Sequence, residues 1–348
     1  MQIKESISFQ ELGDKKFKIR LIEEANTEIE AAYTHYLYNH KNGASKFFKK
    51  DAIKYLISYV NHKYPRENFN QSAAEEALQY LLFQKEDIPY PSHDNPKFKF
   101  IDLFAGIGGF RLALHELEGK CVFTSELDKY SKQTYKANFG ELPFGDITKP
   151  RTKSYIPNEF DVLCAGFPCQ AFSIAGKRGG FEDTRGTLFF EVAKIIKSKE
   201  PKAIFLENIK GLRSHNRGNT LSTILNVLRN DLGYYVPEPQ IINARDFGVP
   251  QNRERIFIVG FRKDLGISDF NYPEPVEEKP TLSSILEKKE VSVKYYLSET
   301  YLETLRRHRK RHESKGNGIG YEIIAGGMGR ERNLKVFRFI NSSSIKVA

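Results

Sequence analysis

Tryptophan is absent from this chain of 348 residues, and cysteine occurs only three times. Three cysteines cannot form a disulfide framework, and without a CxxC pair they do not indicate a zinc site. No apolar run approaches the roughly 18 residues of a membrane helix, and the N-terminal segment lacks the apolar core of a signal peptide. We therefore expect no membrane span, no metal site and a location in the reducing cytoplasm.

The chain combines a large apolar content with a positive charge. Hydrophobic residues make up 40% of it and aromatic residues 13%, which is enough for a substantial core. The formal net charge is +10, and residues 299–348 hold 11 Lys/Arg against 5 Asp/Glu. A basic segment of this kind is typical of a polyanion partner. A solvated basic helix without a ligand is the alternative.

Patterning divides the chain into three regions. Residues 1–96 have apolar residues at helical spacing and end in the Pro-rich linker DIPYPSHDNPK. Residues 97–265 alternate short β-rich runs with helical stretches, which predicts βαβ units and a doubly wound, mostly parallel sheet. Residues 266–348 are irregular and basic. We therefore predict an α/β domain with a helical N-terminal extension and a small C-terminal recognition region.

The expected elements follow from period and composition. The N-terminal helices are predicted over 27–40, 47–64 and 72–83, the last capped by Ser72. The strands of the sheet are predicted over 98–104, 120–126, 160–166, 202–209, 234–242 and 255–262. The helices between them are predicted over 110–118, 129–139, 185–198 and 220–231.

A glycine-rich turn follows the first predicted strand. In DLFAGIGGFRLAL, Gly106, Gly108 and Gly109 allow a tight turn and close approach of a ligand to the backbone. The dinucleotide fingerprint G-x-G-x-x-G fails, because Arg111 stands where its third glycine would fall. This excludes a simple NAD-binding interpretation, and a plain tight βα connection is the alternative to a ligand site.

Two acidic residues follow in the next sheet-end loops. Glu126 ends the second predicted strand, where a carboxylate can accept hydrogen bonds from ribose hydroxyls. Asp146 follows the next βα unit and is placed to meet an adenine amine. Each acid alone is typical of a solvated loop. Glycine, Glu and Asp in three successive loops favour a nucleoside cofactor.

The stretch DVLCAGFPCQAFS holds two of the three cysteines. Pro168 biases Phe167 away from helix and stiffens the loop that presents Cys169. A thiolate is a strong nucleophile when it is exposed in a favourable field. Cys164 and Cys121 lie in apolar, strand-like runs, where a cysteine usually acts as a small buried hydrophobe.

Two later segments add polar groups at strand ends. Glu207 and Asn208 close the strand FLENI, on the edge where doubly wound folds bind ligands. Arg253 and Arg255 lead into the last strand, where alternation would direct both to one face, toward a phosphate or a substrate oxygen. Surface charges at a strand edge are the alternative for this pair.

Six motifs then carry a resemblance. FIDLFAGIGGF, SELD, GDIT, GFPCQAFS, FLENIKGL and PQNRERIFIVGF occur in the order found in the bacterial cytosine-5 DNA methyltransferases of type II restriction–modification systems. The resemblance covers about 98–265 nearly continuously. A shorter match over YYLSETYLETLRRHRKRHESKGNG and GGMGRERNL resembles methylases that act on CC(A/T)GG sites.

The resemblance implies a covalent mechanism. The Cys169 thiolate would attack C6 of a cytosine flipped out of the duplex, and C5 would then take the methyl group of S-adenosylmethionine. Glu207 would hydrogen-bond or protonate N3 and contact the exocyclic amine. Arg255 would meet the cytosine carbonyl oxygen, with Arg253 nearby.

The same resemblance assigns roles around the Pro-Cys loop. Asn208 would help to hold that loop, and Gln170 and Ser173 would lie on the part that closes over the DNA. Cys169 is then the nucleophile and Cys164 belongs to the core.

The cofactor contacts are also implied by the resemblance. Phe104 would stack on the adenine, Glu126 would bind the ribose and Asp146 the adenine amine. Leu127 stands where many family members carry a large aromatic side chain, which predicts weaker stacking. The remaining implied contacts come from the same motifs: Ala105, Gly106, Gly108, Gly109, Ile147 and Pro168.

The C-terminal end departs from the family's pattern. After GGMGRERNL the chain continues as KVFRFINSSSIKVA, in which neither late family motif is found. We therefore expect an incomplete recognition region, with a complementing subunit as one explanation. Two alternatives stay open: methylation of RNA, or a DNA-binding protein or split-enzyme subunit that is inactive alone. A metal site at His308 and His312 lacks further ligands at matching spacing.

Overall fold

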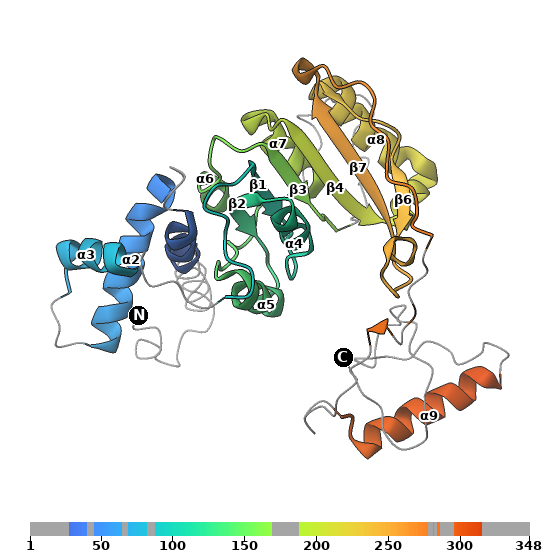
Figure 1. Cartoon of the computed structure of the whole chain (residues 1–348), viewed down its shortest axis with the longest axis horizontal. Helices are drawn as coiled ribbons and strands as arrows, with labels where there is room; N and C mark the ends of the chain where they lie inside the picture. The colour runs from blue at the N-terminus through green and yellow to red at the C-terminus, as the bar shows by residue number, and fades with distance from the viewer. Residues whose placement is uncertain are drawn as a thin grey trace, which may run out of the picture. The chain divides into compact units, whose positions relative to one another are not determined.

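The structure is a computed structural model that describes residues 28–39, 45–64, 69–81, 88–168, 188–277, 281, 284–285 and 296–314. The chain divides into two compact units (Figure 1). The first unit comprises Met1–Ile241 and Arg255–Tyr272. The second comprises Ile242–Glu254 and Pro273–Ala348.

The described strands form one mixed sheet in the order β2-β1-β3-β4-β7-β5, with β6 beside β7. Neighbours among β1 to β4 run parallel, whereas β7 is antiparallel to β4 and to β5. A parallel bridge between Ser125 and Phe144 extends the sheet beyond β2. The strands are β1 (Phe98–Leu103), β2 (Gly119–Ser125), β3 (Val162–Ala165), β4 (Ala203–Ile209), β5 (Tyr234–Tyr235), β6 (Gln240–Asn243) and β7 (Glu254–Arg262).

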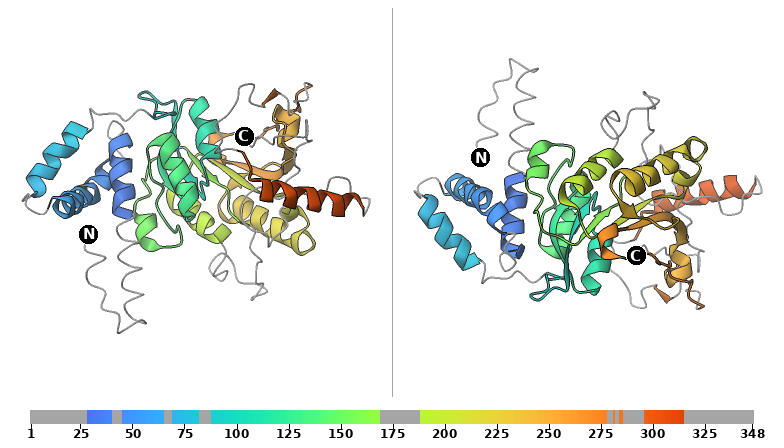
Figure 2. Two further views of the ribbon diagram at one scale, coloured as in Figure 1. Left: turned by 90° about the horizontal axis from the view of Figure 1, so that it is seen from below. Right: turned by 90° about the horizontal axis from the view of Figure 1, so that it is seen from above.

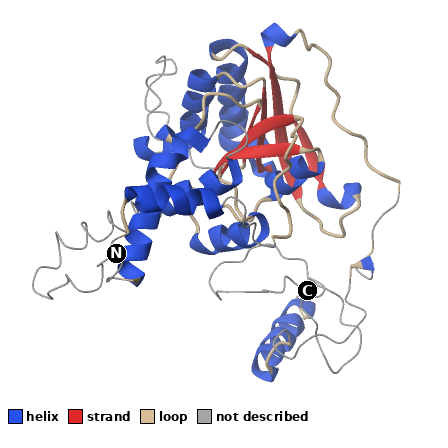
Figure 3. Ribbon diagram, turned by 60° about the vertical axis from the view of Figure 1, so that its left-hand side comes forward, coloured by secondary structure: helices blue, strands red, loops and turns tan. Residues whose placement is uncertain are grey.

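Helices cover both faces of this sheet (Figure 3). Because successive side chains in a strand point to opposite faces, each strand contributes to two separate clusters. On one face, Phe100 and Cys164 pack with Leu114 of α4 (Gly109–Glu116). On the other, Leu163 packs in the cluster that contains Val192 of α7 (Leu188–Lys199). The predicted doubly wound fold is confirmed.

The helices between the strands lie close to their predicted positions. Asp128 caps α5, accepting a hydrogen bond from the backbone N–H of Ser131, and Gly140 ends that helix at a φ of 75°. After α8, a wider helical turn continues over Val227–Asp231. The helices are α4 (Gly109–Glu116), α5 (Lys129–Phe139), α6 (Pro150–Ser154), α7 (Leu188–Lys199) and α8 (Asn219–Asn226).

In the N-terminal region, the described residues form a helix over 28–39, α2 (Ser45–Lys63) and α3 (Gln71–Leu81). Figure 2 shows these helices beside the edge of the sheet in both views. Their apolar residues belong to the same cluster as one face of the sheet. Phe48 of α2, for example, is fully buried, with its ring 6.0 Å from that of Phe144.

Two predictions about element ends are corrected. Ser72 does not cap α3, because the helix begins one residue earlier and the Oδ1 of Asn70 accepts the hydrogen bond from Ala73 N–H at 3.1 Å. The strand predicted over 234–242 is two strands, β5 and β6. Pro237 and Pro239 fall between them, and proline cannot donate to a β-ladder.

The second unit contains the basic helix α9 (Glu299–Glu313). Ser298 caps it by accepting a hydrogen bond from Tyr301 N–H. Leu302 and Leu305 are buried, whereas the basic side chains are mostly exposed. Among the described residues, no helix is long and apolar enough to cross a membrane.

Candidate functional site

The site predicted from sequence lies at the carboxyl ends of the parallel strands β1 to β4. Each of these strands ends in a loop that carries predicted residues, so the sheet brings them to one edge.

After β1 the chain turns sharply at Phe104. This residue has a φ of 57°, a left-handed conformation that costs a bulky side chain energy and that clusters at functional sites. Gly106 and Gly108 follow with φ of 56° and 98°. The turn therefore demands residues that tolerate a left-handed backbone.

The three glycines do different work. Within the described part of the chain, a Cβ at Gly106 or Gly109 would meet no atom within 4 Å. A Cβ at Gly108 would lie 2.3 Å from the ring of Phe139, so the packing of α5 requires glycine at this position. Ala105, between them, is buried and packs with Tyr135. The open cradle thus forms at Gly106 and Gly109.

Glu126, at the end of β2, connects the second loop to the first. Its Oε2 accepts a hydrogen bond from Gly106 N–H at 2.7 Å, and its Oε1 accepts from Leu127 and Asp128 N–H, each at 2.7 Å. A carboxylate offers about four lone-pair positions, so about one remains for a ligand hydroxyl. Leu127 is 73% exposed beside it.

Asp146 and Ile147 follow the bridge at Phe144. Asp146 Oδ1 accepts a hydrogen bond from Thr148 N–H at 2.9 Å, which closes a tight turn around the carboxylate. Ile147 is buried, with 3% of its surface exposed. The turn therefore places the Asp146 carboxylate next to the buried, apolar side chain of Ile147.

The segment after β3 is held from the neighbouring strand. Asn208 is buried at the end of β4, and its Nδ2 donates a hydrogen bond to the backbone oxygen of Phe167 at 2.9 Å. Pro168 follows and is exposed. Asn208 thus fixes the residue two positions before Cys169. The predicted Cys169, Gln170 and Ser173 lie outside the described residues.

Glu207 and Arg255 form an ion pair, with Arg255 Nε 2.7 Å from Glu207 Oε1. Both side chains are about one-fifth to one-quarter exposed (21% and 24%), so the pair stays accessible. The other carboxylate oxygen lies 3.5 Å from the Cβ position of Gly166, and Phe104 O lies 3.9 Å from the same position. The acid therefore lies close to the first turn.

Arg253 does not fit the alternation argument. The strand β7 begins at Glu254, so Arg253 precedes it. Its backbone N–H donates to Asn243 Oδ1 at 3.0 Å and its backbone oxygen accepts from Ala244 N–H. Arg253 thus lies one residue outside the strand, so strand alternation does not decide which way its side chain points.

The two described cysteines are core residues, as predicted. Cys121 and Cys164 are both fully buried. Burial raises the pKa of the Cys121 thiol to about 12 and that of Cys164 well above its usual range. Neither is suited to act as a thiolate.

The donor set fits a nucleoside cofactor better than a metal. The open glycine cradle, the partly filled Glu126 carboxylate and the Asp146 turn are neighbours at one sheet edge. In the described part of the chain, no group of three or more His, Cys, Asp or Glu residues is arranged to hold a metal ion.

A doubly wound sheet with an antiparallel β7, a glycine turn after β1 and an acid at the tip of β2 defines an S-adenosylmethionine-dependent methyltransferase fold. Residues 98–345 match the family model of the C-5 cytosine-specific DNA methylases. The chain belongs to this family. The match runs well past residue 265, where the nearly continuous part of the motif-based resemblance ends, and includes the shorter C-terminal matches.

Three curated relatives give the range of similarity. The chain is 63% identical over 272 residues to the type II methyltransferase M.HpaII of Haemophilus parainfluenzae, covering 75% of each chain. It is 49% identical over 261 residues to M1.ScrFI of Lactococcus lactis subsp. cremoris, covering 74% of this chain and 66% of that one. It is 52% identical over 188 residues to M.HhaI of Haemophilus parahaemolyticus, covering 54% and 56%.

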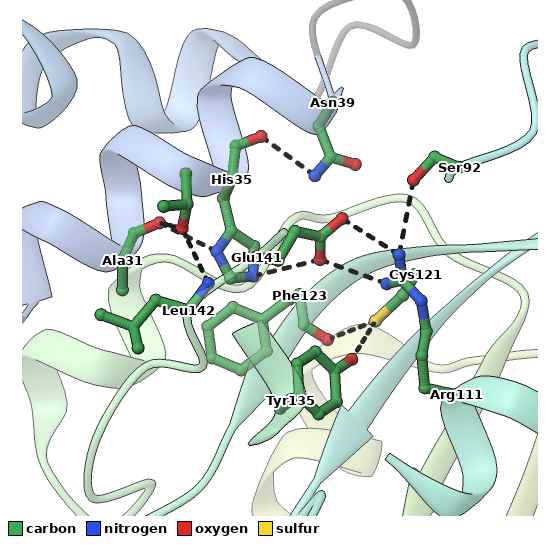
Figure 4. A network of polar contacts seen from close by, with 11 residues as sticks. Ala31, His35, Asn39, Ser92, Arg111, Cys121, Phe123, Tyr135, Glu141 and Leu142 are labelled. Atoms are coloured by element: carbon green, nitrogen blue, oxygen red, sulfur yellow. Dashed lines mark hydrogen bonds and ion pairs between the residues drawn. The ribbon is translucent and has the colours of Figure 1, made fainter. Parts of the chain in front are cut away.

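Sequence reasoning missed three features of the site. Gly166 lies between the two loops, but a single glycine after a strand gives no distinctive signal. Arg111 is fully buried and makes a two-pronged ion pair with Glu141, at 3.1 and 3.2 Å (Figure 4). Glu28 of the N-terminal helix reaches the Asp146 turn. The Arg111–Glu141 ion pair and the contact of Glu28 with Gly145 each join residues that are distant in sequence, so no local pattern indicates them.

Proposed function

We propose that this chain methylates C5 of cytosine in duplex DNA as a type II methyltransferase that protects DNA from a cognate restriction endonuclease. The observation that carries the proposal is the accessible Glu207–Arg255 pair beside the Phe167–Pro168 segment, in a chain 63% identical to M.HpaII over 272 residues. The relatives are named methyltransferases of restriction systems, which favours DNA over RNA as the substrate.

In the proposed reaction, Cys169 is the nucleophile. Its sulfur forms a bond to C6 of a flipped cytosine, and the electron pair of the C5–C6 double bond makes C5 nucleophilic. C5 takes the methyl group as S-adenosylhomocysteine departs. The C5 proton then passes to water, its electron pair restores the C5–C6 double bond, and the S–C6 bond breaks to regenerate the thiolate. The hydrogen bond from Asn208 to Phe167 O supports this role by fixing the start of the loop.

Glu207 would stabilise the charge that builds up on the ring. As an acid it would protonate or hydrogen-bond N3, while Arg255 would contact the carbonyl oxygen of the same base. Their 2.7 Å ion pair places a carboxylate and a guanidinium side by side, a spacing suited to adjacent atoms on one edge of a base. Arg253 stays a further candidate for this edge.

S-adenosylmethionine, when bound, supplies an electrophilic methyl group on its sulfonium. We propose that Glu126 accepts from a ribose hydroxyl, Asp146 from the adenine amine, and that Phe104 stacks on the adenine. The space at Gly106 and Gly109 would admit the ligand close to the backbone. Ala105, Gly108, Leu127, Ile147 and Pro168 would complete the surroundings.

Further proposals concern the DNA contact and the place of the reaction. Gln170 and Ser173 would lie on the loop that closes over DNA, and the target site would resemble CC(A/T)GG. Methylation would take place in the cytoplasm. A complementing subunit that supplies C-terminal family motifs is proposed as a further partner.

The test is transfer of tritiated methyl groups from S-adenosylmethionine to duplex DNA, with RNA of the same sequence in parallel and nucleoside analysis of the product. We expect 5-methylcytosine in DNA only.

Glu207→Gln should lower kcat by about 10²–10⁴-fold, because it removes the acid. Glu238→Gln is the control and should keep wild-type kcat, because Glu238 is an exposed glutamate that pairs with Arg229 and belongs to none of the strand-end motifs. Preferential methylation of RNA, or an unaffected Glu207→Gln, would contradict the proposal.

A further inference from the structure

The helix over 28–39 runs along the chain segment that leads into the Asp146 turn. Three side chains on it meet three successive points of that segment. Tyr38 fills the space where a Cβ of Gly140 would lie, the Oγ1 of Thr34 accepts a hydrogen bond from Leu142 N–H at 2.9 Å, and Glu28 reaches Gly145. The helix and the segment therefore run in opposite directions.

This segment is the outermost part of the sheet among the described residues. Phe144 N–H donates to Thr124 O, and Glu126 N–H donates to Phe144 O, both at 2.9 Å, so its inner side is paired with β2. Backbone N–H groups on the outer side of an edge need other acceptors. The side chains of Thr34 and Glu28 supply these acceptors, in place of the backbone oxygens of a further strand.

Glu28 binds the chain on both sides of the Asp146 turn. Its Oε1 accepts hydrogen bonds from Gly145 N–H at 3.0 Å and from the Thr152 hydroxyl at 3.1 Å, and only 8% of the residue is exposed. Asp146 and Ile147 lie between these two anchor points. One buried carboxylate thus joins the start of the turn to α6, which follows it.

The middle of the same helix is anchored more deeply (Figure 4). His35 is fully buried, with its ring 4.7 Å from that of Phe144 and its Nε2 3.9 Å from Glu141 Oε2. Glu141 in turn holds Arg111 of α4, the helix that follows the glycine turn. The N-terminal helix is therefore anchored to the segment before the Asp146 turn and, through Glu141, to α4, which follows the glycine turn.

We propose that Glu28 is a positioning residue for cofactor recognition, which acts by holding Asp146 and Ile147 in place from the N-terminal extension. This inference rests on the proposed function, because it assumes that Asp146 binds the adenine amine. Affinity for S-adenosylmethionine would then depend on a residue of the N-terminal extension, which lies outside the motifs of 98–265.

The test is isothermal titration of the full-length chain with S-adenosylmethionine. Glu28→Ala should raise Kd about tenfold, because the turn that carries Asp146 loses its anchor. In the background of Asp146→Ala, the same substitution should cause no further rise, since the group through which Glu28 acts is already gone. In steady-state assays, KM for S-adenosylmethionine should rise while kcat and KM for DNA stay at wild-type values.

Two matched variants separate positioning from general stability. Glu30→Ala removes a glutamate of the same helix that pairs with Lys136 of α5 at 2.9 Å, and it should leave Kd unchanged. Glu28→Gln keeps an acceptor oxygen at the same position and should recover most of the affinity. If Glu28→Ala does not fold, Thr152→Val removes one of the two donors and should raise Kd by itself.

The outcomes distinguish this inference from the function on which it rests. An unchanged Kd in folded Glu28→Ala, or a loss that adds fully to that of Asp146→Ala, would overturn the inference alone. If the wild type failed to bind S-adenosylmethionine, the proposed function and the inference would both be wrong. If Asp146→Ala bound as the wild type does, the route through Asp146 would be overturned.

Discussion

Asp102 is a carboxylic acid whose charge is controlled by its place in the sheet. It lies on β1, in register with Thr124 of β2 and Cys164 of β3, and it is fully buried. Neither carboxylate oxygen has a hydrogen-bond partner among the described residues. Burial therefore raises the pKa of Asp102 to about 7, although the charge of Arg111 acts to lower it.

This raised pKa predicts a pH dependence of stability. From about pH 4 to pH 7 the folded protein keeps a proton on Asp102 that the unfolded chain releases, so this contribution is complete at low pH and is lost as pH rises through about 7. Asp102→Asn cannot ionise. Its free energy of unfolding, relative to wild type, should therefore increase by about 1–3 kcal/mol from pH 5 to pH 8.

Urea unfolding at the two pH values measures this difference. Asp128→Asn is the control, because the hydrogen bond from Ser131 N–H lowers the pKa of Asp128 and leaves it ionised in both states over this range. The Asp102 account is contradicted if the difference between Asp102→Asn and wild type does not change with pH.

At the scale of residues, sequence predicted which strand ends carry chemistry but not how their groups are paired. Glu207 and Asn208 were expected at a strand tip because they close an apolar run, and they lie there. The Arg111–Glu141 pair, 30 positions apart, could not be predicted, because an ion pair between helix and loop leaves no periodic trace. For Arg253, strand alternation gives no direction, because the strand begins one residue later, at Glu254.

At the scale of elements, hydrophobic periodicity predicted the sheet and its helices well. Each predicted strand from 98 to 262 corresponds to an observed one, since buried parallel strands form short apolar runs between turns. The exceptions are local: two prolines divide one strand, and Asn70 rather than Ser72 caps α3. What the N-terminal helices pack against was not predictable, because an apolar face does not specify its partner.

The packing of α2 gives a prediction for that element. Phe48 is fully buried among the rings of His35, Phe144 and Tyr155. Phe48→Ala should lower the free energy of unfolding by about 3–5 kcal/mol, because it leaves a cavity shared by the N-terminal helices and the sheet. Tyr59→Ala, on the same helix but 41% exposed, should cost less than about 1 kcal/mol.

Thermal and urea unfolding of both variants check this. We expect Phe48→Ala to lower the midpoint of the transition in which the sheet unfolds. If it affected only a separate, early transition and left the sheet's midpoint unchanged, the N-terminal helices would not share a core with the sheet.

At the scale of the whole molecule, positive charge is concentrated toward the C-terminal end of the chain, in residues 299–348. On α9, Arg306, Arg307, Lys310 and Arg311 are exposed, while Leu302 and Leu305 are buried, so the basic residues form a solvent-facing stripe. Such a stripe is suited to phosphates, whose contacts release counterions and make affinity depend on salt.

Neutralising part of this stripe should therefore weaken DNA binding in a salt-dependent way. Arg307→Gln with Arg311→Gln should reduce the slope of log K against log salt by about 1–2, if each contacts one phosphate. Fluorescence anisotropy with labelled duplex at several salt concentrations measures it. Lys263→Gln, on a different segment, is the control. A slope equal to that of the wild type would exclude α9 from the DNA contact.

The most direct test of the covalent mechanism is trapping on 5-fluorocytosine. Fluorine at C5 cannot leave as the proton does, so a methylated adduct should persist on a denaturing gel when the chain is incubated with S-adenosylmethionine and substituted duplex DNA. We expect an adduct with the wild type and none with Cys169→Ser that still binds the cofactor. An adduct of equal yield with Cys169→Ser, or methylated DNA formed without any adduct, would contradict the covalent mechanism.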